Sequence, residues 1–152
     1  MYNFYIQTST VTFEEVNLTA GQLAGRMERV QSQKLPWLVA ELDQTLLGYA
    51  YAAPWRERSA YRYTVEVSAY VAPDQAGCGI GTCLYRALLP QLEASPLRTA
   101  VAVIPLPNPA SVALYEKLGF AKAAHLEAIG FKLGRWVDVG YWQRDLAYNR
   151  SF

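Results

Sequence analysis

A loop with three glycines is the part of this sequence whose residue types and spacing point most directly to chemistry. Its glycines are Gly77, Gly79 and Gly81; an apolar run ends at Val71 before them, and helical periodicity begins at Ile80. Glycines let the backbone approach a ligand closely and adopt positive φ, so several N–H groups can converge on one anion. The helix start adds unpaired N–H groups and a positive dipole end. The loop favours phosphate binding, although a tight turn would use glycines similarly.

A glutamate just before this loop could act as a general base. Between Val65 and Val71 apolar residues alternate with Glu66, Ser68 and Tyr70, which is the period of a strand with two different faces. If Glu66 is partly buried on a central strand, its raised pKa suits removal of a proton from an ammonium group. The alternative is a solvated or ion-paired strand glutamate.

Two arginines form a third candidate group. Arg56 and Arg58 lie one residue apart, between Trp55 and Tyr61. A guanidinium fork pairs well with a carboxylate or phosphinate, so these residues could hold an acidic substrate. The alternative is that both are ordinary surface charges.

The elements that must position these residues alternate between strands and helices, without repeats or linkers, which predicts a mixed α/β fold in a single domain, 1–152. Pro90 should bend or end the helix that follows the glycine loop. In the second half, Asn108 can cap a helix, Pro109 fits its first position and Gly119 can close it. We expect a helix over Thr19–Gln33, strands over Trp37–Glu41, Leu46–Ala53, Val65–Val71 and Thr99–Ile104, a turn at Asp43–Thr45, and a buried helical stripe of Ile80, Cys83, Leu84, Ala87 and Leu88.

Composition excludes several classes of function. The 152 residues are 52% hydrophobic and 18% charged, with a formal charge of +1. A net charge this small does not attract nucleic acid or an anionic membrane surface. No apolar run has the length of a membrane span. No secretory leader opens the sequence, so we expect a cytosolic protein. Cys78 and Cys83 are expected to be reduced thiols, no metal site is expected, and His125 is read as structural or surface.

The glycine loop and the segment Asn108–Phe120 resemble the two signatures of the GNAT N-acetyltransferases. Within that superfamily, four further segments resemble the phosphinothricin acetyltransferase family, so the likeness covers nearly the whole chain. They are Tyr5–Phe13, Pro36–Glu41, Val101–Ile104 and Gly130–Gly140.

The resemblance implies a GNAT fold, a mixed central sheet flanked by helices, that lacks the family's first strand and most of its first helix. It also implies acetyl-CoA as co-substrate, Glu66 as the base and Tyr115 as the acid that protonates the departing thiolate, although close relatives carry histidine at that place. The alternative is that Tyr115 only packs its ring. The implied acetyl-CoA site consists of Val71, Gly77, Gly79, Ile80, Gly81, Thr82, Asn108 and Ser111.

For the acceptor, the resemblance implies a small amine bound by Phe13, Arg56, Arg58, Tyr61 and Trp136, in a protein that forms a homodimer. Together these readings predict acetyl transfer to the α-amino group of a small acidic amino acid or analogue. One departure is Ala76, which stands where the family's loop usually has Arg or Gln, so a side-chain contact to the phosphates is lost. The alternative function is an acyl-CoA-binding sensor or partner module without turnover.

Overall fold

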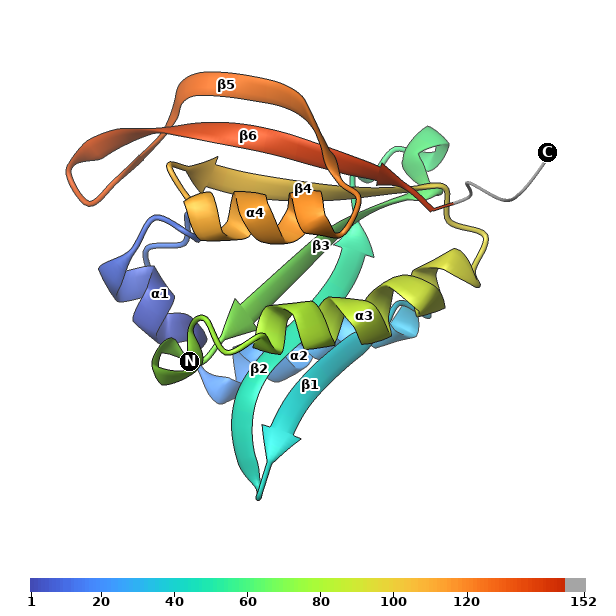
Figure 1. Ribbon diagram of the computed structural model, residues 1–152, viewed down its shortest axis with the longest axis horizontal. Coiled ribbons are helices and arrows are strands. Elements are labelled where there is room, and N and C mark those ends of the chain that lie inside the picture. The colour runs from blue at the N-terminus through green and yellow to red at the C-terminus, as the bar shows by residue number, and fades with distance from the viewer. Residues whose placement is uncertain (147–152) are drawn as a thin grey trace.

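The computed structural model describes residues 1–146, which form one mixed sheet with helices on both of its faces (Figure 1). The strand order is β1-β2-β3-β4-β6-β5, and every neighbouring pair is antiparallel except β3 and β4. The predicted mixed α/β fold is therefore confirmed. The elements are α1 (Tyr2–Thr8), α2 (Ala20–Ser32), β1 (Trp37–Leu42), β2 (Thr45–Pro54), η1 (Ser59–Tyr61), β3 (Thr64–Val71), η2 (Pro73–Gln75), α3 (Ile80–Glu93), β4 (Thr99–Leu106), α4 (Pro109–Lys117), β5 (Ala121–Lys132) and β6 (Arg135–Asp145).

Local sequence explains where several elements begin. The Thr19 side chain accepts a hydrogen bond from the backbone N–H of Gln22, and the Gln22 side-chain oxygen accepts one from the backbone N–H of Thr19. The two bonds form a capping box at the start of α2. Between β1 and β2, Asp43 and Gln44 have φ of 49° and 63°, as a two-residue hairpin turn of type I′ requires. The predicted helix, hairpin and strands are confirmed to within a few residues.

One expectation about α3 is wrong, and another is narrowed by the structure. Pro90 is expected to bend or end the helix, and it does not end it, because the helix continues to Glu93. Cys83 and Ala87 do not belong to the buried stripe, because both are exposed. Small side chains tolerate either environment, whereas the large ones decide which face of a helix turns inward. The buried residues of α3 are Leu84, Tyr85, Leu88, Leu89 and Leu92.

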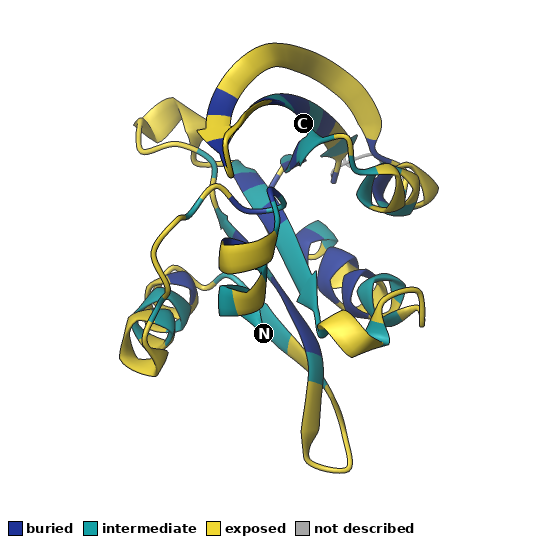
Figure 2. Cartoon of the chain, turned by 90° about the vertical axis from the view of Figure 1, so that its left-hand side faces the viewer, coloured by how far each residue is buried: buried dark blue, intermediate teal, exposed yellow. Residues whose placement is uncertain are grey.

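The main core lies between the sheet and the two helices α3 and α4. Figure 2 shows buried stripes on helices turned toward the sheet, while β5 is exposed along most of its length. The opposite face of the sheet is covered at β1 and β2 by α2. The core cluster combines residues of α3, such as Leu88, with Val65 and Val67 of β3, Ala100 and Ile104 of β4, and Trp142 of β6.

Strands β3 and β4 pair over only three residues. The register runs from Thr64 opposite Thr99 to Glu66 opposite Val101, and beyond that point the two strands separate. On their other edges both strands stay paired, β3 with β2 up to Val71 and β4 with β6 up to Leu106. The sheet is therefore intact at its margins and open in its centre, where parallel strands end beside the starts of α3 and α4.

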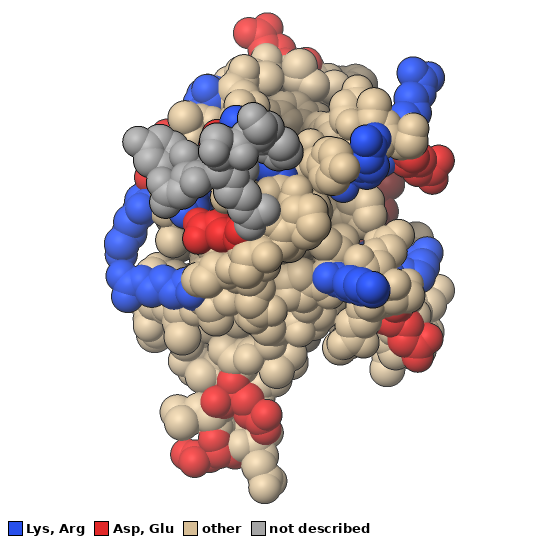
Figure 3. Space-filling view, turned by 90° about the vertical axis from the view of Figure 1, so that its right-hand side faces the viewer, with Lys and Arg blue, Asp and Glu red and all other residues tan. Residues whose placement is uncertain are grey.

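The surface carries charges of both signs. On the side drawn in Figure 3, Lys and Arg side chains are interspersed with Asp and Glu, and they do not merge into one basic area. This agrees with the formal charge of +1. Among residues 1–146, no helix is both long and apolar enough to cross a membrane.

Candidate active site

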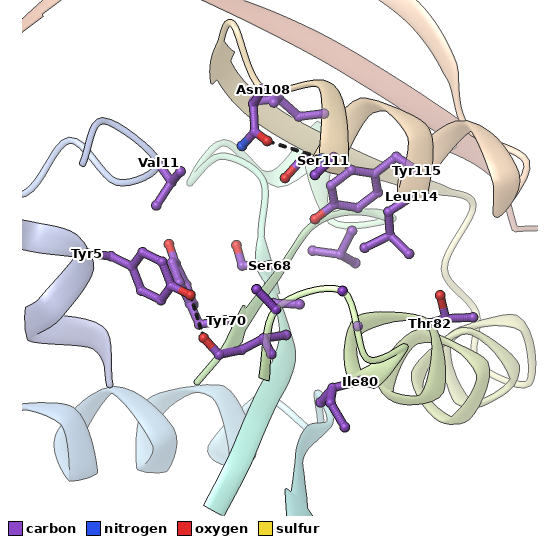
Figure 4. Close-up of a pocket in the computed structure, with 18 of the residues that line it drawn as sticks. Tyr5, Val11, Ser68, Tyr70, Ile80, Thr82, Asn108, Ser111, Leu114 and Tyr115 are labelled. Atoms are coloured by element: carbon purple, nitrogen blue, oxygen red, sulfur yellow. Dashed lines mark hydrogen bonds between the residues drawn. The ribbon is translucent and has the colours of Figure 1, made fainter. Parts of the chain in front are cut away.

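A cleft of about 440 Å³ occupies the centre of the sheet where β3 and β4 separate. Its walls come from β3, the glycine loop, β4 and the starts of α3 and α4 (Figure 4). The residues that the sequence assigned to acetyl-CoA all line this cleft, namely Val71, Gly77, Gly79, Ile80, Gly81, Thr82, Asn108 and Ser111. These eight residues, which extend from Val71 to Ser111 in the sequence, thus meet around one space.

The glycine loop is shaped to present its backbone rather than side chains. Gly77 and Gly79 have φ of 77° and 81°, a conformation that residues with a Cβ rarely adopt. Gly79 is also the N-cap of α3, and no side chain there accepts a hydrogen bond from the first turn. The N–H groups at this helix start are thus available to an anion, in the field of the helix dipole. The donor set fits the phosphate groups of a nucleotide-containing ligand.

The start of α4 closes the cleft from the other side. The Asn108 side chain accepts a hydrogen bond from the Ser111 backbone N–H at 3.1 Å, and Pro109 occupies the first turn. The side-chain oxygen of Asn108 is used in this capping hydrogen bond, so the side-chain NH₂ group is the part of Asn108 that can donate to a ligand. The predicted capping is confirmed, while the binding role of Asn108 remains a prediction.

Glu66 lies at the point where β3 and β4 part. On the same face of β3, Ser68 lines the cleft on one side of it, and on the other side Thr64 lines a second groove of about 320 Å³. Burial raises the pKa of Glu66, and the positive charge of Arg56 acts in the opposite direction. Glu66 itself is not among the residues that line either space, and its position between them follows from its place on β3 between Thr64 and Ser68. A partly buried carboxylate at this place can accept a proton from a group that comes within its reach, and its role as the base remains a prediction.

Tyr115 lines the cleft from α4 and is itself buried, with 7% of its surface exposed. Its hydroxyl is 2.5 Å from the hydroxyl of Tyr85, which lies on α3 and was not singled out from the sequence. Burial raises the pKa of Tyr115 to about 12, and the hydrogen bond with Tyr85 acts in the opposite direction. A phenol in this state is protonated at neutral pH and can serve as a proton donor.

The predicted acceptor residues fall into two groups. In the first, Tyr61 and Trp55 line the second groove, and the Arg56 guanidinium stacks on the Trp55 ring at 4.1 Å. Arg58 is exposed at the start of the short helix η1, and Tyr61, which lines the groove, is the last residue of that helix. The groove is thus walled by aromatic rings and bordered by a cation.

The second group lies where the loop between α1 and α2 meets the β5–β6 hairpin. A side chain at Gly130 would overlap the Phe13 ring, so that ring lies directly on the hairpin backbone. The buried Lys132 donates a hydrogen bond to the Thr12 carbonyl at 2.7 Å, which ties the loop to β5. Trp136, at the start of β6, is 68% exposed. Trp136 is paired with Phe131 and its ring packs against that ring, so it points to the opposite face of the hairpin from Gly130 and Phe13. The structure therefore does not bring Phe13 and Trp136 together.

Some residues of this site were missed by sequence reasoning. Tyr5 and Val11 line the cleft from α1 and the loop after it, and the Tyr5 hydroxyl donates a hydrogen bond to the Val71 carbonyl at 2.5 Å. The spacing from Tyr5 to Val71 carries no local signal, because only the folded chain joins the two segments. His125, by contrast, bonds Asp138 at 2.8 Å on the surface, as expected of a non-catalytic histidine. Both cysteines are unpaired thiols, as predicted.

No metal chemistry is suggested by the side chains of residues 1–146. No group of three or more His, Cys, Asp or Glu among them could hold a metal ion. The arrangement can instead bind a phosphate-bearing ligand in the cleft and place its reactive end near a carboxylate and a phenol.

The sequence is similar to those of known acetyltransferases. A model of the acetyltransferase (GNAT) family matches residues 1–120. A phosphinothricin N-acetyltransferase of Streptomyces viridochromogenes is 46% identical over 143 residues, which cover 94% of this chain and 78% of that protein. An L-methionine sulfoximine/L-methionine sulfone acetyltransferase of Pseudomonas aeruginosa is 34% identical over 152 residues, which cover 99% and 88% of the two chains.

A solved structure shows the same fold. The structure of yncA from Salmonella typhimurium with its cofactor acetyl-CoA matches with a TM-score of 0.94 at 31% sequence identity. The match covers 99% of this chain and 87% of that one. The fold around the cleft is therefore one that holds acetyl-CoA in a similar protein.

Proposed function

The chain belongs to the acetyltransferase (GNAT) family, and we propose that it transfers the acetyl group of acetyl-CoA to the α-amino group of a small acidic amino acid or analogue. Phosphinothricin and methionine sulfoximine are the acceptors suggested by the names of similar enzymes. The observation that carries the proposal is the position of Glu66, between the central cleft and the groove beside Arg56. In this proposal residues 1–152 form one cytoplasmic acetyltransferase domain.

In the proposed mechanism, Glu66 accepts a proton from the acceptor's ammonium group, directly or through water, so that the free amine can attack the thioester carbonyl. Tyr115 then donates its hydroxyl proton to the sulfur as the carbon–sulfur bond breaks. Over the reaction the nitrogen gives up two protons; the sulfur keeps one and solvent receives the other, so Glu66 and Tyr115 end as they began. The backbone of the glycine loop and the first turn of α3 hold the phosphates throughout.

The proposed acceptor specificity rests on charge. An amine reaching Glu66 through the second groove would carry its acidic end toward Arg56 and Arg58, whose guanidinium groups suit a carboxylate or phosphinate. The aromatic walls of the groove, Trp55 and Tyr61, suit the acceptor's carbon chain.

A panel of amines tests the function directly. The purified protein is incubated with acetyl-CoA and one amine at a time, and free CoA is measured with a thiol reagent. We expect turnover with phosphinothricin and methionine sulfoximine, and little with cationic amines such as polyamines. Binding of acetyl-CoA without turnover on any amine would instead support the sensor function.

Ala76 gives a prediction about co-substrate affinity. It lines the cleft at the end of η2, and as alanine it offers no charge to a phosphate. We expect Ala76→Arg to tighten acetyl-CoA binding by roughly 1 kcal/mol or more, because it adds a charge-assisted contact to those from the backbone. Calorimetric titration of both proteins with CoA measures this, with dephospho-CoA as a control ligand. Equal affinities would show that position 76 does not reach the phosphates.

We also propose that the protein is a homodimer that pairs through the β5–β6 hairpin. Four large apolar side chains of this hairpin are more than half exposed, although they lie close together in sequence: Ile129, Phe131, Leu133 and Trp136. Such a concentration of exposed apolar residues is typical of an interface. Light scattering coupled to size exclusion should give twice the chain mass of 17.0 kDa, and Phe131→Glu should reduce it to that mass. A wild-type protein that elutes at 17.0 kDa would contradict this.

A further inference from the structure

Tyr85 is hydrogen-bonded to Tyr115, the proposed acid. Tyr85 of α3 and Tyr115 of α4 meet with their hydroxyl oxygens 2.5 Å apart. Tyr115 lines the cleft, whereas Tyr85 lies outside the lining and has no exposed surface. Figure 4 shows the Tyr115 ring among the side chains around the cleft. Tyr85 therefore does not contact a ligand in the cleft, and its hydroxyl reaches the cleft through Tyr115.

The packing holds the two rings in a fixed relation. The Tyr115 ring contacts the edges or faces of two other rings, Tyr85 at 5.3 Å between centroids and Phe120 at 5.2 Å, both in T-shaped geometry. One turn before Tyr85, a Cβ at Gly81 would be 3.1 Å from a methyl carbon of Leu114, so a side chain of α4 packs directly on the backbone of α3 there. The two tyrosines thus meet where side chains of α4 reach α3.

The two hydroxyls can share their protons in two ways. Each phenol has one proton, and either oxygen can be the donor of this hydrogen bond. If Tyr115 donates to Tyr85, its proton points away from the cleft and is not available to a ligand. If Tyr85 donates to Tyr115, the Tyr115 proton is free to point into the cleft, and Tyr85 also stabilises the negative charge left on the Tyr115 oxygen after proton transfer.

We propose that Tyr85 is a positioning residue for the reaction: its buried hydroxyl donates to the Tyr115 oxygen and so directs the Tyr115 proton toward the leaving sulfur. This inference rests on the proposed function, in which Tyr115 protonates that sulfur. Tyr85 exchanges no proton with the substrates. Its effect is confined to the step in which the carbon–sulfur bond breaks, because only there does charge develop on the Tyr115 oxygen.

A double-mutant cycle tests the proposal. Tyr85→Phe removes one oxygen and keeps the ring, so the core remains filled. We expect it to lower kcat about tenfold with the best amine, and to leave KM for acetyl-CoA unchanged. In a Tyr115→Phe background, the same substitution should change kcat by less than twofold, since the group through which it acts is gone. Tyr63→Phe, at an exposed tyrosine, is the matched control.

The outcomes separate this inference from the function on which it rests. Equal losses of kcat from Tyr85→Phe in both backgrounds would show a structural role and overturn the proposal, as would no loss in the wild-type background. If Tyr115→Phe leaves kcat unchanged in an active enzyme, Tyr115 is not the acid and the inference fails with it. A wild-type protein that acetylates no amine overturns the proposed function itself.

Discussion

Glu66→Gln should lower kcat/KM for acetyl transfer by on the order of a hundredfold or more at neutral pH, because glutamine keeps the shape of the side chain but cannot accept a proton. Acetyl-CoA binding should persist, since the cleft residues that would hold the phosphates lie on the glycine loop and α3. Initial rates with saturating acetyl-CoA measure the loss. Glu57→Gln, at an exposed glutamate in the loop between β2 and η1, serves as the matched control. Near-normal turnover of the Glu66 variant would remove this residue from the mechanism.

The raised pKa of Glu66 adds a pH profile and a stability effect to this prediction. Burial raises the pKa, so in the wild type kcat/KM should fall with decreasing pH at a higher pH than for an ordinary carboxylate. A pKa raised by folding means that the folded state favours the protonated form, and the stability which this provides at low pH is lost as pH rises through the folded pKa. At neutral pH the buried charge therefore costs stability. Glu66→Gln should raise the melting temperature while it lowers activity, a combination that damage to the fold cannot produce.

Arg58→Ala should raise KM for acidic acceptors and leave neutral amines nearly unaffected. A charge-assisted hydrogen bond to a carboxylate or phosphinate contributes roughly 1 to 3 kcal/mol, which corresponds to about 5- to 150-fold in KM. The measurement is KM for phosphinothricin and for a neutral amine of similar size, with wild type and variant side by side. A selective loss identifies Arg58 as the group that binds the acidic end.

Another arginine of the same segment provides the control. Arg62 is exposed, stacks on Tyr63 at 4.6 Å and donates a hydrogen bond to the Ser59 carbonyl. Arg62→Ala removes the same single positive charge as Arg58→Ala, but from a residue that does not line the groove. Equal losses of activity on acidic and neutral amines from Arg58→Ala would mean that Arg58 supports η1 instead. Arg56→Ala is expected to act differently again, because Arg56 lowers the pKa of Glu66 and its removal should raise that pKa further.

Local sequence patterns were sufficient for those features that depend on neighbouring residues. Alternation between Val65 and Val71 predicted β3, and Asn108 with Pro109 predicted the start of α4. The glycine spacing predicted the strand-to-helix loop, since the φ of Gly79 can be met cheaply only by glycine. The family resemblance, confirmed by the match over residues 1–120, then supplied the fold and the co-substrate.

Features that depend on distant contacts could not be predicted in this way. The helical stripe of α3 was assigned one position away from the true one, since Cys83 and Ala87 are compatible with either face of a helix, and the buried Tyr85 was overlooked as a result. Its partner Tyr115 is thirty residues further on. Similarly, Lys132 pairs with the Thr12 carbonyl across 120 residues, and nothing near either residue signals that bond.

The short pairing of β3 with β4 has a consequence for how the protein recognises its ligand. Beyond Glu66 and Val101 the facing edges of β3 and β4 are not paired with each other, although both strands lie in the middle of the sheet. Such edges present peptide groups that need partners, and at the outer margin of a sheet they recruit another strand. Here the space between them admits a slender chain whose own amides can take the place of that strand. The pantetheine arm of acetyl-CoA has amides of this kind, so we expect it to bind here as an added strand inside the molecule. Recognition of the arm then depends on main-chain groups, which tolerate substitution of the side chains around them.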